Sequence, residues 1–140
     1  MRTTVLTIAM ASLTCLAAAA DTSAVELNVA GILPGPSSGT VYVSLCSEAE
    51  FMKGPCALKA RAKADAASLS LKIESVPPGR YAASAWWDFN DNGEMELGSY
   101  GEPLEPVAIS NDAVGVMGPP SFADAAFDVP VTVPVALTFK

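Results

Sequence analysis

The chain contains no histidine, and this absence excludes several classes of enzyme. Without an imidazole there is no Ser-His-Asp or Cys-His arrangement, and no side chain whose ordinary pKa lies near neutral pH. The sequence also lacks a nucleophile elbow, a P-loop and a dinucleotide-binding fingerprint. We therefore expect a protein that is not an enzyme. The catalytic alternative is a carboxylate pair that hydrolyses glycosides, formed by Asp88 with Glu102 or Glu105.

Basic residues are scarce. The 140 residues include 8 Lys and Arg against 15 Asp and Glu, which gives a formal net charge of −7. Nucleic-acid binding depends on Lys and Arg that neutralise phosphates, so an acidic chain of this kind is a poor candidate for it. The same charge opposes binding to anionic membrane surfaces.

Long hydrophobic runs are absent except at the N-terminus. Residues 5–16 are mostly apolar, follow Arg2, and precede four alanines that end at Ala20. This pattern is typical of a cleaved secretory signal peptide and is too short for a membrane span. We expect a signal peptide at 1–20, cleavage after Ala20, and one periplasmic or secreted domain at 21–140 without membrane insertion.

Cysteine is also scarce. Cys15 lies in the expected signal peptide, where it could be lipidated, but Thr14 stands where lipidation prefers a small residue. Cys46 and Cys56 remain after cleavage. An even number of cysteines in an exported chain indicates one disulfide that closes the short loop between them. The alternative is two independent buried thiols.

Most of the mature chain alternates apolar and polar residues, which is the pattern of a half-buried strand. Such segments occur at 25–29, 41–45, 69–73, 81–87 and 127–139. In the last segment Pro130 and Pro134 each remove a backbone donor, so it is either an edge strand or two strands joined by a bend.

Helical periodicity is nearly absent. A turn at 48–52 and a short capped turn at 120–124, with Ser121 as N-cap, are the two helical candidates. Short strands separated by turns predict an all-β fold, an antiparallel β-sandwich. We expect about seven strands and one long ordered loop at 98–120.

The segment 88–96 contains four carboxylates, two carboxamides and no Lys or Arg. Counted as a calcium loop, its side-chain oxygens would come from the first, third and fifth positions, a main-chain carbonyl from the seventh, and a further oxygen from the ninth. The twelfth position should be a bidentate Glu but is Ser99, and the flanks are not helices, so this is not an EF-hand. The predicted ligands are Asp88, Asn90, Asn92, Glu94 and Glu96, with the missing carboxylate from Glu102, Glu105 or Asp112.

The alternative for this segment is a solvated turn without metal. Asn92-Gly93 is a strong turn signal, and Asp and Asn side chains cap their own backbone. Against it, four carboxylates would repel one another without a cation. Oxygen ligands without His or Cys favour calcium over zinc or copper.

Aromatic residues are few, and Trp86, Trp87 and Tyr100 lie beside the acidic segment. Trp86 and Trp87 are neighbours on one expected strand and so face opposite sides of the sheet. One is expected to pack in the core. The other, with Tyr100, is a candidate binding surface for carbohydrate or a partner protein. The alternative is that loop and core bury both Trp side chains.

Four motifs resemble one bacterial family. They are Pro-Gly-Arg-Tyr-Ala at 78–82, Asp-x-Asn-x-Asn-Gly at 88–93, Gly-Glu-Pro-x-Glu at 101–105, and Gly-Pro-Pro-Ser-Phe-x-x-Ala-x-Phe at 118–127. In order and together, they are similar to the exported domain-of-unknown-function family numbered 2141. The resemblance implies an exported β-sandwich of Ig-like or transthyretin-like type and supplies no activity. The chain departs from the family at Trp87, where His is more usual, and at Glu96, where Asp is commoner.

These observations favour a non-enzymatic module of the cell envelope, stabilised by calcium, that binds an envelope protein or carbohydrate. The alternative is a carrier for a small molecule or lipid with a pocket between the two sheets. A carboxylate-dependent glycoside hydrolase is the third candidate.

Overall fold

The computed structural model describes residues 21–35 and 38–140. The expected signal peptide at 1–20 lies outside the described residues. Among the described residues, no helix is both long enough and apolar enough to cross a membrane.

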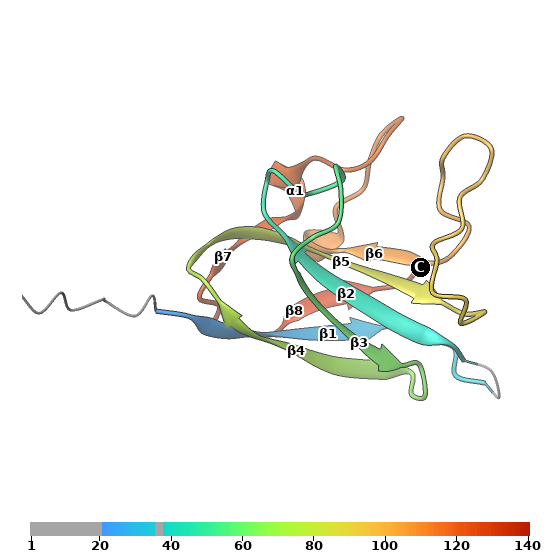
Figure 1. The fold of residues 1–140 in the computed structure, drawn as a ribbon, viewed down its shortest axis with the longest axis horizontal. Coiled ribbons are helices and arrows are strands. Elements are labelled where there is room, and N and C mark those ends of the chain that lie inside the picture. The colour runs from blue at the N-terminus through green and yellow to red at the C-terminus, as the bar shows by residue number, and fades with distance from the viewer. Residues whose placement is uncertain (1–20, 36–37) are drawn as a thin grey trace, which may run out of the picture.

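Two β-sheets pack face to face, as predicted for a β-sandwich (Figure 1). The smaller sheet has the order β4-β1-β8. The larger has the order β3-β2-β5-β6, and β7 also pairs with β5. The strands are β1 (Ser23–Ala30), β2 (Thr40–Cys46), β3 (Leu58–Lys63), β4 (Ser68–Val76), β5 (Gly79–Asp88), β6 (Val107–Ile109), β7 (Ala126–Val129) and β8 (Val135–Thr138).

Alternation along the strands produces the core. Val25, Leu27 and Val29 of β1 are fully buried, whereas Glu26 and Asn28 between them are exposed. In the larger sheet, the inward residues of β2 are buried in the same way. Because both sheets send one apolar parity inward, a single cluster of buried side chains fills the space between them.

The segment at 127–139 is two strands with a bend, as one of the alternatives proposed. β7 pairs antiparallel with β5, whereas β8 pairs parallel with β1 in the other sheet. The chain therefore changes sheets between Val129 and Val135. The parallel β1–β8 pair departs from a purely antiparallel sandwich, although every other strand pair is antiparallel.

The predicted long loop at 98–120 is interrupted by structure. β6 and a short 3-10 helix, η1 (Ser110–Asp112), lie within it, so the structure has two loops here, 89–106 before β6 and 113–121 after η1. The turn after the second loop is α1 (Phe122–Ala125), and the Ser121 side chain accepts a hydrogen bond from the Asp124 backbone, as an N-cap does.

Two strands were not predicted, β6 within the expected long loop and β3. β3 has the sequence Leu-Lys-Ala-Arg-Ala-Lys, so two of its three inward residues are alanines. Alanine and lysine are both depleted in strands, and alanine buries little area, so the alternation gave a weak signal. β3 forms one edge of the larger sheet, where its outward cations are Lys59, Arg61 and Lys63.

Candidate functional site

The acidic segment begins where β5 ends. Asp88 is the last residue of β5, pairs with Thr40 of β2, and is fully buried. Gly39 precedes β2 with a positive φ of 70°, and a Cβ at this position would overlap the Asp88 carbonyl oxygen. The two strand ends therefore meet closely, and this contact fixes where the following loop starts.

The carboxylate of Asp88 turns back into the loop. One oxygen accepts a hydrogen bond from the Gly93 backbone at 2.8 Å, and the other accepts from the Asn92 backbone at 3.2 Å. Gly93 has φ 80°, which glycine adopts readily. The loop thus wraps around a buried carboxylate.

The predicted ligands of this loop lie close to one another. The side-chain amides of Asn90 and Asn92 both donate to one Glu96 oxygen, each at 2.7 Å. The Asn90 oxygen accepts from the Asn92 backbone at 3.1 Å, and the Asn92 oxygen accepts from the Glu94 backbone at 2.9 Å. These last two bonds are Asx turns, which is the geometry of the alternative interpretation, a turn without metal.

Glu105 lies beside this cluster and is buried. Its side chain is 2% exposed, and neither carboxylate oxygen has a hydrogen-bond partner among the described residues. Burial raises the pKa of Glu105 and is the largest effect. The nearby backbone N–H of Glu96 lowers this pKa, the negative charges of Asp88 and Glu96 raise it, and the backbone N–H of Phe89 lowers it, in that order of size. A buried carboxylate without a partner is costly, and such groups are usually paired or bound to metal.

The other two candidates for the missing carboxylate lie elsewhere. Glu102 accepts a hydrogen bond from the Tyr100 backbone at 3.0 Å and packs against Gly98. Asp112 is in η1 and is 3.5 Å from the ammonium of Lys140. Of the three, the structure therefore brings Glu105 to the buried side of the acidic loop.

Asp91 has a role that the sequence did not suggest. Its carboxylate forms an ion pair with Lys63 of β3 and accepts a hydrogen bond from Thr40 at 2.6 Å. The hydrogen bond from Lys63, followed by that from Thr40, lowers the pKa of Asp91. Asp91 therefore ties the acidic loop to the outer edge of the larger sheet. Because β3 was not predicted, this contact could not be predicted either.

Within residues 21–35 and 38–140, no three side chains of His, Cys, Asp or Glu are grouped so as to hold a metal ion. Asp88, Glu96 and Glu105 are therefore not grouped as three ligands of one metal ion in this structure. The candidate set also includes Asn90 and Asn92, which would supply neutral amide oxygens. Such oxygens, with carboxylates and main-chain carbonyls, are the ligands that calcium takes.

The two tryptophans face opposite sides of the larger sheet. Trp87 is buried against Phe139, and its indole N–H donates to the Ser38 carbonyl. Trp86 lies on the outer face, half-buried, and stacks on Tyr42 with ring centroids 4.6 Å apart. Tyr100 is 97% exposed. The surface predicted around Trp86 and Tyr100 is therefore on the outer face, and Trp87 is not part of it.

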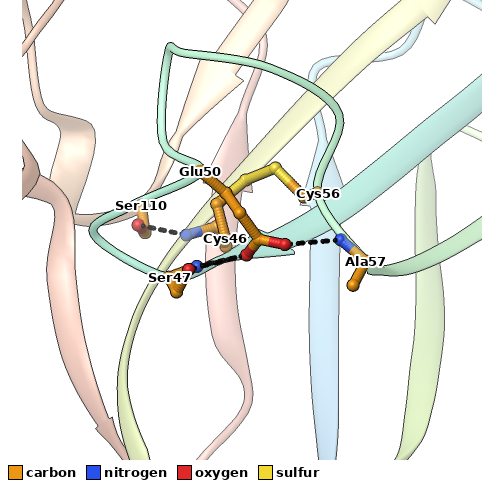
Figure 2. Close-up of a disulfide and its surroundings, with 7 residues drawn as sticks. Cys46, Ser47, Glu50, Cys56, Ala57 and Ser110 are labelled. Atoms are coloured by element: carbon orange, nitrogen blue, oxygen red, sulfur yellow. Dashed lines mark hydrogen bonds between the residues drawn. A yellow bond between two sulfur atoms is a disulfide. The ribbon is translucent and has the colours of Figure 1, made fainter.

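A second loop, closed by a disulfide, lies near this face. Cys46 and Cys56 form a disulfide, and Glu50 lies between the two ends of the loop that they close (Figure 2). The Glu50 carboxylate accepts hydrogen bonds from the Ser47 backbone at 2.9 Å, the Ser47 hydroxyl at 2.8 Å and the Ala57 backbone at 3.1 Å. These bonds, those from Ser47 first, lower the pKa of Glu50.

Searches of the curated proteins and of the solved structures find no match to this chain. A search against protein families matches residues 29–134, a span that contains the acidic loop, Glu105 and the disulfide loop. The chain therefore belongs to the family described as "Uncharacterized protein conserved in bacteria (DUF2141)".

Proposed function

We propose that this protein is an exported, non-enzymatic binding module of the bacterial cell envelope whose acidic loop binds calcium. The observation that supports the metal is Glu105. A carboxylate that is 2% exposed, has no hydrogen-bond partner among the described residues and is repelled by Asp88 and Glu96 would be stabilised by a cation between them. A plain turn gives no reason to bury it.

The oxygen atoms available fit calcium. Asp88, Glu96 and Glu105 would contribute carboxylate oxygens, Asn90 and Asn92 amide oxygens, and Glu94 its main-chain carbonyl. With water, this set reaches the six to eight oxygens that calcium takes. Two neutral ligands make the site weak, with a Kd of about 10⁻⁴ to 10⁻³ M, as in extracellular modules. Such a site fits a periplasmic or secreted protein, and the disulfide favours the same oxidising compartments.

A role without catalysis is supported by the burial of the carboxylates. Asp88 and Glu105, one of the pairs considered for glycoside hydrolysis, are buried at 0% and 2% exposure. A carboxylate pair that cleaves a glycosidic bond must flank that bond, so it has to be open to a sugar chain. The carrier alternative has no comparable support, because the core cluster fills the space between the sheets.

The test is the melting temperature of the mature protein in EDTA, in calcium and in magnesium. With about 5 mM calcium and the affinity above, native-state binding adds about 1–2 kcal/mol, a rise of about 3–10 °C. Magnesium should give a smaller rise, because it demands a tighter octahedral site. Equal melting temperatures in EDTA and calcium would exclude the site and leave residues 88–96 as a turn.

A further inference from the structure

The outer face of the larger sheet is hollowed between three loops. The disulfide loop, the acidic loop at 89–106 and the loop at 113–121 rise on the side away from the smaller sheet (Figure 1). The space between them, here called the outer groove, has a volume of about 810 Å³. Its lining is mostly apolar and includes Trp86 on the floor, with Met52, Met95, Leu97, Tyr100 and Met117 around it. Sites of this volume are in the range of ligand pockets.

The rim of the outer groove is exposed as well as apolar. Tyr100 is 97% exposed, Leu97 is 57% exposed and Met117 is fully exposed. A small ligand on the floor would leave these side chains in water. A larger partner would cover them, and exposed apolar patches of this kind mark protein interaction sites. Methionine suits such a surface because its side chain adapts to different partners.

A second hollow of about 520 Å³ lies on the other side of Trp86 and is cationic. Lys59, Arg61 and Tyr42 are among the residues that line it. Neither Lys59 nor Arg61 forms an ion pair with a residue in 21–35 or 38–140, although the chain carries a net charge of −7. Two free cations on an acidic protein complement an acidic group of a partner.

Strand register sets the distance between the cationic hollow and the outer groove. Arg61, Tyr42, Trp86 and Val107 are paired in turn across β3, β2, β5 and β6. Neighbouring strands are about 4.8 Å apart, so Arg61 lies about 10 Å from Trp86 and about 14 Å from Val107. An extended peptide advances about 3.3 Å per residue, so a partner would need its acidic residue three or four positions from its apolar residue.

We infer that the outer groove docks an extended peptide segment of another envelope protein, with apolar side chains over Trp86 and a carboxylate at Arg61 and Lys59. The inference names the partner class for the proposed binding function and rests on it. It does not depend on calcium, although Gly93 and Met95 of the acidic loop border the two hollows.

The experiment selects random displayed peptides on the immobilised mature protein and measures the Kd of the selected peptides by the fluorescence of the two tryptophans. We expect the selected sequences to share an acidic residue three or four positions from a large apolar one. Arg61→Glu and Leu97→Asp should each weaken binding about tenfold or more, the loss expected from one charge-assisted or buried apolar contact. The matched controls are Arg80→Glu and Leu33→Asp, at exposed residues that line neither hollow. Both should leave the Kd unchanged.

Four results would overturn the inference. These are failure to enrich any peptide, selected peptides without an acidic residue, and equal affinities for the groove variants and their controls. The fourth is another occupant: saturable binding of decanoate that displaces the peptides, or self-association of the protein that Leu97→Asp abolishes. Measurements are repeated in calcium and in EDTA. Peptides that still bind in EDTA, together with a melting temperature that calcium does not change, would support docking in the outer groove. They would exclude only the calcium site.

Discussion

Glu105 and Asp88 are two buried carboxylates whose charges repel. Asp88 ends β5, and Glu105, near the end of the acidic loop, lies close to it, with no hydrogen-bond partner among the described residues. Burial and this repulsion raise the pKa of Glu105. A protein that keeps this pair without a counterion loses stability as the pH rises from 4.5 toward the raised pKa, because the folded state then holds its proton more tightly than the unfolded state.

The variant Glu105→Gln distinguishes between two roles of Glu105, that of a metal ligand and that of a structural residue. It removes a buried charge, so the melting temperature in EDTA at neutral pH should stay equal or rise. The same change removes a carboxylate ligand, so the calcium-specific rise of about 3–10 °C should disappear. Melting curves in EDTA and calcium measure both effects.

Glu102→Gln is the matched control, because Glu102 belongs to the same loop but bonds to Tyr100. It should retain the calcium rise. The opposite result would be a Glu102→Gln variant that loses the calcium rise and a Glu105→Gln variant that keeps it. It would assign the ligand to Glu102 and refute the choice of Glu105.

Strand alternation predicted the sandwich and the core, because the period-two segments turn most of their apolar parity inward; Val133, in the bend between β7 and β8, is exposed. β3 was not predicted because its inward positions are mostly alanine. For the same reason the contact between Asp91 and Lys63 of β3 was not predicted. The spacing of 88–96 placed five candidate oxygen donors in one loop. It could not choose among Glu102, Glu105 and Asp112, because that choice depends on which side chain the fold of residues 98–112 turns inward.

Gly39→Ala should destabilise the protein. Gly39 has φ 70°, which costs an L-residue about 1–2 kcal/mol, and the added Cβ would overlap the Asp88 carbonyl oxygen. We expect a loss of at least about 1 kcal/mol in the free energy of unfolding, measured by urea denaturation. Gly35→Ala is the control, since a Cβ there meets nothing within 4 Å. Equal losses in the two variants would show that the close contact with Asp88 is unimportant.

Glu50→Gln tests the anchor of the disulfide loop. Hydrogen bonds from Ser47 and Ala57 lower the pKa of Glu50 below its ordinary value of 4.5. For a lowered acid pKa, the stabilisation is complete above 4.5 and is lost as the pH falls through the folded-state pKa. The variant should therefore melt below the wild type at pH 7, and the difference should shrink in acid.

Glu48→Gln is the control for Glu50, because Glu48 is an exposed carboxylate of the same loop whose side chain forms no hydrogen bond among the described residues. It should follow the wild-type curve across the pH range. A difference between Glu50→Gln and the wild type that is constant with pH would contradict the electrostatic explanation.

The double variant Cys46→Ala with Cys56→Ala should lose about 2–3 kcal/mol of stability, the chain-entropy value for a short closed loop. The cysteines are 10 residues apart, so the cross-link restricts only a short segment of the unfolded chain. Glu50 still bonds to both ends of the loop in the folded state, so the native fold should persist. Urea denaturation of the wild type and the variant, with and without reductant, measures the loss. Reductant should bring the wild type to the value of the variant and leave the variant unchanged; a wild type that reductant does not affect would mean that the bond contributes nothing to stability.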